Sequence, residues 1–226
     1  MKQIIRNNKG FTLVEMAIVL VIIGLLLGGV LKGQELIENS KSKKAVNDLN
    51  AISVAYNGYV DRYGRIPGDD GPVATLQARG GNWANITVAG NRNGILAITP
   101  AQTFATGGES VAFWQAVKAS GFIAGNPADT GVAALPTNAY QGLIGVANNT
   151  TGITGMVQGL SVCISQVPGK AAAQLDSQLD DRNPATGSVR ATIGAAGLNT
   201  APGAAPAPSA TATYSEDNQY TVCRAL

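Results

Sequence analysis

The longest uninterrupted apolar stretch of the chain covers residues 11–31 and contains one charged residue, Glu15. Because a helix rises about 1.5 Å per residue, about 21 apolar residues are long enough to span a hydrocarbon core of roughly 30 Å. The stretch is preceded by three basic residues and no acidic one: Lys2, Arg6 and Lys9. The positive-inside rule therefore predicts one membrane span, with residues 1–10 in the cytoplasm and the rest of the chain across the membrane.

A helical pattern continues beyond this span as far as Tyr63, without a proline to interrupt it. Apolar and small side chains recur at steps of three and four, at Val46, Leu49, Ser53, Tyr56, Val60 and Tyr63. Charged residues lie mostly elsewhere on the helix, so the pattern predicts an amphipathic continuation that packs one face on a globular head. Gly64 suits the C-cap of this helix, and Pro67 prevents its continuation.

The remaining pattern predicts an α+β head. Residues 65–100 are rich in Gly, Asn and Asp and are expected to form a structured loop. A second helix is expected over residues 109–120, with Trp114 anchored in the core, and a short third helix over 168–176. Alternating or β-branched runs predict strands over residues 140–147, 153–164, 188–193 and 219–224. Residues 199–212 consist almost entirely of small residues and proline, which predicts an exposed loop.

The amino-acid composition narrows the classes of function that the chain is expected to have. Only 13% of the 226 residues are charged, and the formal charge of +2 becomes −1 once the three basic residues of 1–10 are removed. Net charge therefore predicts no general affinity for nucleic acid. The chain has no His, no Cys-x-x-Cys, no Gly-x-Ser-x-Gly and no Walker loop, so no enzymatic activity and no cofactor are predicted. A pair of carboxylates acting on glycans is the enzymatic alternative.

The chain contains two cysteines, Cys163 and Cys223. The predicted export places both in an oxidising compartment, so we expect one disulfide that ties the last strand to the sheet. Two buried free thiols are the alternative. The acidic pairs Asp69–Asp70 and Asp180–Asp181 raise the possibility of calcium, but a full calcium site uses about six to eight oxygen ligands. We therefore interpret these carboxylates as turn-forming and capping groups and predict no metal site.

Residues 10–15 read Gly-Phe-Thr-Leu-Val-Glu and resemble the processing site of type IV prepilins and type II secretion pseudopilins. The apolar core is not followed by the small-residue cleavage site of an ordinary secretory signal. The resemblance implies that prepilin peptidase cleaves between Gly10 and Phe11 and that the new amine of Phe11 is N-methylated. A carboxylate in hydrocarbon needs a cationic partner. By resemblance, Glu15 meets the Phe11 amine of a neighbouring subunit. A Glu15 that reaches the membrane interface instead is the alternative.

The same resemblance implies a fold and a domain order. The expected fold is α+β, with a long N-terminal helix packed on an antiparallel β-sheet head in the ladle shape of pilins. Residues 1–10 are the leader, 11–31 the transmembrane and assembly helix, 32–64 its amphipathic continuation, and 65–226 the head, whose C-terminal region is closed by the disulfide. The stretches 175–181 and 184–187 also resemble pilin-like heads.

The resemblance also implies a function. The chain is expected to be a structural subunit that waits in the inner membrane, leader in the cytoplasm, and then polymerises into a type IV pilus-like filament on the cell surface. Its expected partners are copies of itself, prepilin peptidase and the assembly machinery of the inner membrane. Two alternatives remain open: a pseudopilin that forms a periplasmic piston, and a membrane-anchored binding protein that never polymerises.

Overall fold

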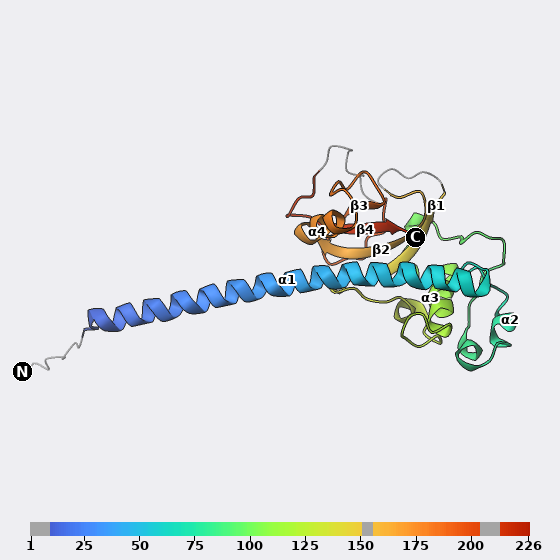
Figure 1. Ribbon diagram of the computed structural model, residues 1–226, viewed down its shortest axis with the longest axis horizontal. Helices are drawn as coiled ribbons and strands as arrows, with labels where there is room; N and C mark the ends of the chain where they lie inside the picture. The colour runs from blue at the N-terminus through green and yellow to red at the C-terminus, as the bar shows by residue number, and fades with distance from the viewer. Residues whose placement is uncertain (1–9, 151–155, 204–212) are drawn as a thin grey trace, which may run out of the picture. The chain divides into compact units, whose positions relative to one another are not determined.

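The computed structural model describes residues 10–150, 156–203 and 213–226 (Figure 1). The chain divides into two compact units, one ending at Ser40 and one beginning at Lys41. Helix α1 (Leu13–Tyr63) contributes to both units, and each unit is described by itself. The unit that begins at Lys41 is called the head.

In the first unit, α1 presents only exposed side chains from Leu13 to Lys32. The most apolar stretch of α1 is not buried against any other part of the chain that the structure describes. Among the residues that the structure describes, α1 is the one helix long and apolar enough to cross a membrane. The helix predicted over residues 11–31 is thus confirmed from Leu13 onward, and its composition fits anchoring in a membrane.

Within the head, one stripe of α1 is buried: Ser42, Ala45, Leu49, Ile52, Ala55 and Tyr59. The predicted stripe was wrong by about one residue, because of its members only Leu49 is fully buried and the others lie at the edge. The elements that pack against the helix decide which face is buried, and they cover Ile52 and Tyr59 instead of their neighbours Ser53 and Val60. The predicted end of the helix is confirmed, since the Gly64 amide donates to the carbonyl of Val60 and Gly64 has a φ of 62°.

Four antiparallel strands form one sheet in the order β1-β2-β4-β3. They are β1 (Ile144–Asn149), β2 (Gly159–Pro168), β3 (Val189–Gly194) and β4 (Gln219–Ala225). The last two agree with the prediction to within one residue. The first begins later than predicted because Asn138 accepts hydrogen bonds from the Tyr140 and Gly142 amides and holds a turn there. The second begins at Gly159 instead of 153; residues 153–155 lie outside the described residues.

The two faces of the sheet have different neighbours. Val162 and Ile164 of β2 and Val222 of β4 belong to the main core, which also contains Ala45, Leu49, Ile52 and Tyr59 of α1. On the same face, Arg224 donates a hydrogen bond to Asn50 of α1. Alternate residues point the other way, so Cys163 and Cys223 form a smaller cluster with Ala147 and Met156. The sheet thus has a helix face and a disulfide face.

The other helical elements are α2 (Val73–Gln77), α3 (Gly108–Ala119), α4 (Gly169–Leu179) and the 3₁₀ turns η1 (Gly81–Asn85), η2 (Pro100–Gln102) and η3 (Gly131–Ala134). Of these, α4 lies between β2 and β3 in the sequence and the rest lie between α1 and β1. Trp114 of α3 is fully buried, as predicted. Helix α4 continues three residues beyond the predicted end at 176. The loop predicted over residues 65–100 contains α2 and η1, so the prediction missed two short helical elements.

Candidate processing and assembly site

Gly10 and Phe11 lie just ahead of α1 and have no regular secondary structure. Both are exposed, and the side chain of Phe11 is 80% exposed although it is large and apolar. The peptide bond between them is therefore in an open segment next to the start of a helix. Cleavage there and N-methylation of Phe11 remain predictions.

Thr12 and Glu15 close the first turn of α1 on itself. The carboxylate of Glu15 accepts a hydrogen bond of 2.8 Å from the Thr12 amide and one of 2.9 Å from the Thr12 hydroxyl. In return, the Glu15 amide donates to the Thr12 hydroxyl at 3.2 Å. This reciprocal arrangement is a capping box, whose sequence signature is Ser or Thr followed three residues later by Glu or Gln. The sequence analysis missed this role of Thr12, although the signature is present.

Because of the capping box, the Glu15 carboxylate needs a positive charge from a partner but not hydrogen-bond donors. Before any other molecule arrives, the carboxylate already has two donors from its own chain, and it lies in the first turn, where the helix dipole favours a negative charge. These contacts lower the cost of holding a carboxylate near hydrocarbon without neutralising its charge. A cationic group from another subunit would supply that neutralisation. The pairing of Glu15 with the Phe11 amine remains a prediction.

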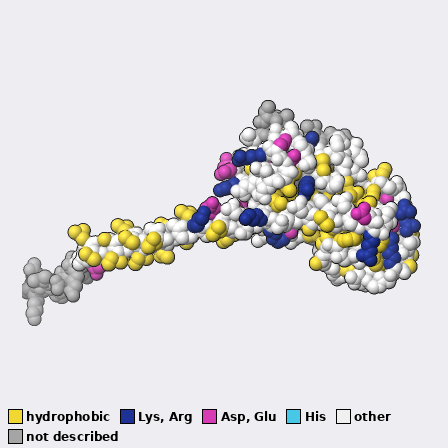
Figure 2. Space-filling model, in the orientation of Figure 1, with side chains coloured by type: hydrophobic (Ala, Val, Ile, Leu, Met, Phe, Trp, Pro, Cys, Tyr) yellow, Lys and Arg dark blue, Asp and Glu magenta, His cyan; other side chains and the backbone are white. Residues whose placement is uncertain are grey.

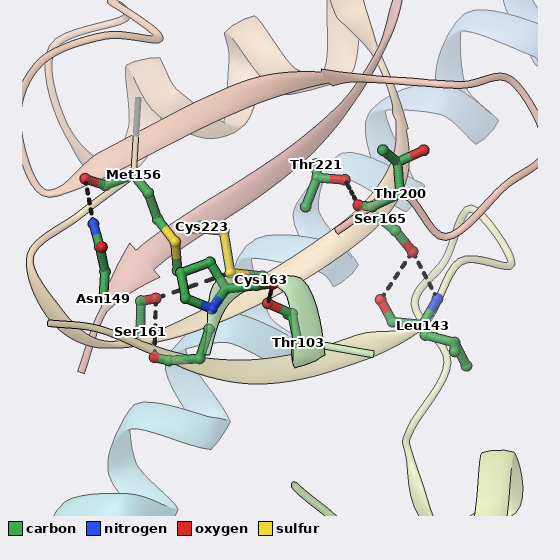
Figure 3. Close-up of a disulfide and its surroundings, with 12 residues drawn as sticks. Thr103, Leu143, Asn149, Met156, Ser161, Cys163, Ser165, Thr200, Thr221 and Cys223 are labelled. Carbon is green, nitrogen blue, oxygen red and sulfur yellow. Dashed lines mark hydrogen bonds between the residues drawn. A yellow bond between two sulfur atoms is a disulfide. The ribbon is translucent and has the colours of Figure 1, made fainter. Parts of the chain in front are cut away.

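The disulfide between Cys163 and Cys223 joins directly opposite residues of β2 and β4, whose Cα atoms are 4.0 Å apart (Figure 3). Both cysteines are buried, and Met156 lies beside them in the close-up. The bond spans 60 positions in the sequence, and neither cysteine is free. The predicted bridge between the last strand and the sheet is therefore present, and the alternative of two free thiols does not hold.

The predicted Ala/Pro loop begins at an anchored position. Asn199 accepts hydrogen bonds from the Leu143 amide and the Ser165 hydroxyl. The carbonyl of Thr200 accepts one of 2.6 Å from the Thr221 hydroxyl (Figure 3). The chain before the loop is thus tied to β2 and β4. Most of the predicted loop, residues 204–212, lies outside the described residues, so its exposure remains a prediction.

Asp69 and Asp70 are both buried, and each has partners within the head. Asp69 accepts hydrogen bonds from the amides of Arg92 and Gly94, which holds that turn. Asp70 accepts from the Tyr59 hydroxyl at 3.1 Å and from Arg79 at 2.7 Å. The predicted turn-forming role fits Asp69. It was incomplete for Asp70, whose carboxylate links α1 to the segment that follows α2.

Asp176, Asp180 and Asp181 form the one group of three possible metal ligands found in the described residues, with carboxylate oxygens within 4.8 Å of one another. Each already accepts hydrogen bonds: Asp176 from Tyr214, Asp180 from the Ser188 and Val189 amides, and Asp181 from Thr186. Three carboxylates are fewer than the six to eight oxygens, roughly, that calcium takes. Their contacts agree with the capping interpretation. Burial raises the pKa of Asp176, and the Thr186 hydrogen bond lowers that of Asp181.

An exposed apolar helix joined in one chain to a four-stranded antiparallel sheet defines a pilin-like α+β protein. Residues 5–31 match the family model of the prokaryotic N-terminal methylation motif, which is the hallmark of type IV pilin and pseudopilin precursors. The motif implies processing by prepilin peptidase and association with the membrane, and it is typical of structural proteins. Among curated proteins, none matches the chain.

Proposed function

We propose that the chain is a structural subunit of a type IV pilus-like filament. In this proposal, prepilin peptidase cleaves between Gly10 and Phe11, the Phe11 amine is methylated, and the mature subunit leaves the inner membrane for a filament. The observation that carries the proposal is the methylation motif on an apolar helix whose side chains are all exposed from Leu13 to Lys32. Such a surface needs lipid or other helices around it.

Glu15 has the central role in the proposed assembly. A carboxylate at the start of an apolar helix and a new amine at Phe11 carry opposite charges, and their attraction is strong only where water is excluded. Packing of neighbouring helices provides that environment. The Glu15 contacts with Thr12 support this role, because they hold the carboxylate at the helix start, close in sequence to the new amine. The pairing would set the axial register of the subunits.

Replacing Glu15 with Ala tests the proposal. We expect Glu15→Ala to be expressed, inserted and cleaved, but to give filaments at a small fraction of the wild-type yield. Glu35→Ala is the matched control, because Glu35 is exposed on the same helix and forms an ordinary surface ion pair with Lys32 at 2.7 Å. Filaments sheared from cells and quantified by immunoblot give the yield. Equal yields from Glu15→Ala and wild type would remove Glu15 from the assembly mechanism.

Processing is tested separately by intact-mass measurement of the protein from membranes. The proposal requires a mature chain that begins at N-methylated Phe11. A retained leader, or a cut near Gly29, would contradict it and would favour a membrane-anchored protein that does not polymerise.

The alternative of a pseudopilin shares the motif and the processing but differs in its product. Electron microscopy of sheared cells separates the two, because a pilus subunit is found in long surface filaments whereas a pseudopilin is absent from them. Immunogold labelling of the filaments identifies the subunit.

A further inference from the structure

The chain contains two Asn-Gly dipeptides, Asn57–Gly58 and Asn93–Gly94. In such a dipeptide the glycine nitrogen can attack the side-chain carbon Cγ of asparagine, because glycine has no side chain to obstruct the approach. The attack forms a bond between the nitrogen and Cγ and breaks the bond between Cγ and Nδ2. The Nδ2 group takes up the proton of the glycine amide and leaves as ammonia. Water then opens the cyclic succinimide, which leaves aspartate or isoaspartate in place of asparagine.

Asn57 and Gly58 lie inside α1, where the helix itself opposes this reaction. Amides in the interior of a helix donate to carbonyls one turn earlier, so the proton of the Gly58 amide is engaged. The Asn57 side chain donates a hydrogen bond of 2.9 Å to the carbonyl of Ser53. The succinimide can form at Asn57 only where the helix opens. This dipeptide is therefore a reference for protection by secondary structure.

Asn93 and Gly94 lie in a turn, without a helix or strand to protect them. Both residues are exposed, and Gly94 has a φ of 82°. The ion pairs of Asp70 with Arg79 and Arg92 place this turn beside the segment that follows α2. Figure 2 shows charged side chains of both signs on the surface at the α2 end of the head, so this end faces water. Sequence and exposure alone would make Asn93 the more reactive of the two asparagines.

The buried carboxylate of Asp69 holds the amide that would have to react. Its Oδ2 accepts a hydrogen bond of 2.7 Å from the Gly94 amide, and its Oδ1 accepts one of 2.8 Å from the Arg92 amide. The Asn93 amide donates to the same Oδ1 at 3.3 Å. Asp69 is 4% exposed, so little water competes for these amides. Successive amides directed at one carboxylate form a compact anion-binding turn.

These contacts oppose the attack on Asn93. The Gly94 nitrogen becomes a nucleophile only as it loses its proton, and that proton is held in a charge-assisted hydrogen bond. Loss of the proton would also place negative charge on the nitrogen, next to the negative charge of Asp69. The Asn93 side chain is held as well, because its Oδ1 accepts a hydrogen bond of 2.9 Å from the Ile95 amide.

We infer that Asp69 protects Asn93 from conversion to aspartate or isoaspartate, in addition to holding the turn. The inference goes beyond the proposed function, because it concerns the chemical lifetime of the head and holds for a pilus subunit and a pseudopilin alike. Conversion would place a second carboxylate beside Asp69, and isoaspartate would also add a carbon atom to the backbone between the amides that Asp69 binds. The surrounding backbone leaves little room for such a change, since a Cβ at Gly90 would lie 2.6 Å from the Cα of Asp69.

Mass spectrometry of the full-length protein in detergent micelles tests the inference. Samples are kept at mildly alkaline pH, with and without urea, and are digested after increasing times. The masses of the two Asn-Gly peptides and their isoaspartate content give the rate of conversion at each site. In urea we expect similar rates at Asn57 and Asn93. In the folded protein we expect both sites to convert at least about tenfold more slowly than in urea, because a hydrogen bond to a charged group is strong.

Asp69→Asn isolates the contribution of the carboxylate, because it removes the charge and keeps the size of the side chain. We expect this variant to speed the conversion of Asn93 by about tenfold and to leave Asn57 unchanged. Glu109→Gln is the matched control, since the Glu109 carboxylate accepts a hydrogen bond from the Ala97 amide of the same segment instead of the Gly94 amide. This variant should convert Asn93 at the wild-type rate.

Asn57 also reports whether a variant is folded, because unfolding speeds the conversion of both sites. If Asp69→Asn unfolds the head, hydrogen exchange of the Gly94 amide in the wild type decides, since exchange requires loss of the same proton. Exchange much slower than in urea supports the inference, and exchange as fast as in urea contradicts it.

Three further results would overturn the inference. The first is conversion of Asn93 in the folded wild type at the rate seen in urea or faster, which would make Asp69 a base that assists the attack. The second is an Asp69→Asn variant in which Asn57 stays protected and Asn93 converts at the wild-type rate. The third is a Glu109→Gln variant that speeds Asn93 as much as Asp69→Asn does, which would assign the protection to the stability of the whole segment.

Discussion

The two parts of helix α1 share one backbone conformation but depend on different surroundings. From Leu13 to Lys32 every side chain is exposed, whereas from Ser42 to Tyr59 one stripe is buried in the core of the head. Helical propensity does not explain the difference, since both parts are helical and Gly24, Gly28, Gly29 and Gly33 weaken the first part. The second part is stabilised by packing within its own chain. The apolar side chains of the first part are shielded from water only when lipid or other copies of the chain surround them.

This difference predicts that the stability of the head and the assembly of subunits depend on different parts of α1. Changes in the buried stripe should act on the folded head, and changes near Glu15 should act on processing and packing with other copies. The following predictions, from the largest expected effect to the smallest, test whether the two parts are as independent as the structure indicates.

Removal of the disulfide should have the largest effect, and only on the head. In the chain-entropy model, a bridge across 60 positions stabilises a folded state by about 4 kcal/mol. Cys163→Ala with Cys223→Ala should therefore lower the free energy of unfolding by about that amount, measured by urea unfolding in detergent micelles followed by Trp fluorescence. Cleavage of the leader should be unaffected, since Gly10 and Phe11 lie in the other unit. Wild type unfolded under reducing conditions is the matched control, and an unchanged midpoint in both would contradict the prediction.

Within α1, burial should decide the effect of losing a side chain. Leu49 is 0% exposed, so Leu49→Ala should destabilise the head by about 2 to 5 kcal/mol through lost burial and a cavity. Val54 is 69% exposed on the same helix, and Val54→Ala should change stability by less than about 0.5 kcal/mol. The same urea titration measures both. Similar losses of stability in Leu49→Ala and Val54→Ala would mean that the buried face of α1 is not the one that contains Leu49.

Thr12 should act locally, at the start of the apolar part. Thr12→Val keeps the shape of the side chain but removes the hydroxyl that joins Glu15 in the capping box, a loss of about 1 kcal/mol. Amide hydrogen exchange at residues 13–16 in micelles should become about fivefold faster. Thr12→Ser keeps the hydroxyl and should exchange like wild type. Head stability should not change, and a head destabilised by Thr12→Val would show that the two parts are coupled.

The smallest expected effect is a dependence of head stability on pH. Burial raises the pKa of Asp176, so this residue favours the folded state below the ordinary Asp pKa of about 3.9, and its contribution is lost as pH rises through the folded pKa. The Thr186 hydrogen bond lowers the pKa of Asp181, which therefore contributes above the ordinary pKa and loses its contribution as pH falls. Thermal unfolding between about pH 3 and 7 should show opposite changes of slope in Asp176→Asn and Asp181→Asn. Changes of the same sign would contradict the assignment.

Features set by local pattern were predictable from the sequence. The apolar run, the end of α1 at Gly64 and helix α3 follow from periodicity and capping, and export with two cysteines was enough to predict their bond. The capping box of Thr12 and Glu15 was equally local and was overlooked.

Features set by distant partners were not predictable in this way. Asp70 reads as a turn residue, but its partner Tyr59 lies 11 positions earlier, on a helix face that only the folded head defines. The buried stripe was misplaced for the same reason, because the elements that approach α1 in the folded head decide which of its residues become core residues. Arg62 and Arg92 are likewise far apart in the sequence and are connected only in the folded head, where Arg79 shares Tyr63 with Arg62 and Asp70 with Arg92.

The order of the strands has a consequence for the timing of biogenesis. β4 follows β3 in the chain but lies between β2 and β3 in the sheet, so β3 has no strand to pair with until residues 219–225 have been added to the chain. Until then Cys163 also lacks its partner. A chain interrupted before residue 219 therefore keeps Cys163 as a free thiol and leaves β3 unpaired, with backbone groups that can pair with another chain. Completion of the sheet and of the disulfide thus reports that the chain extends through β4.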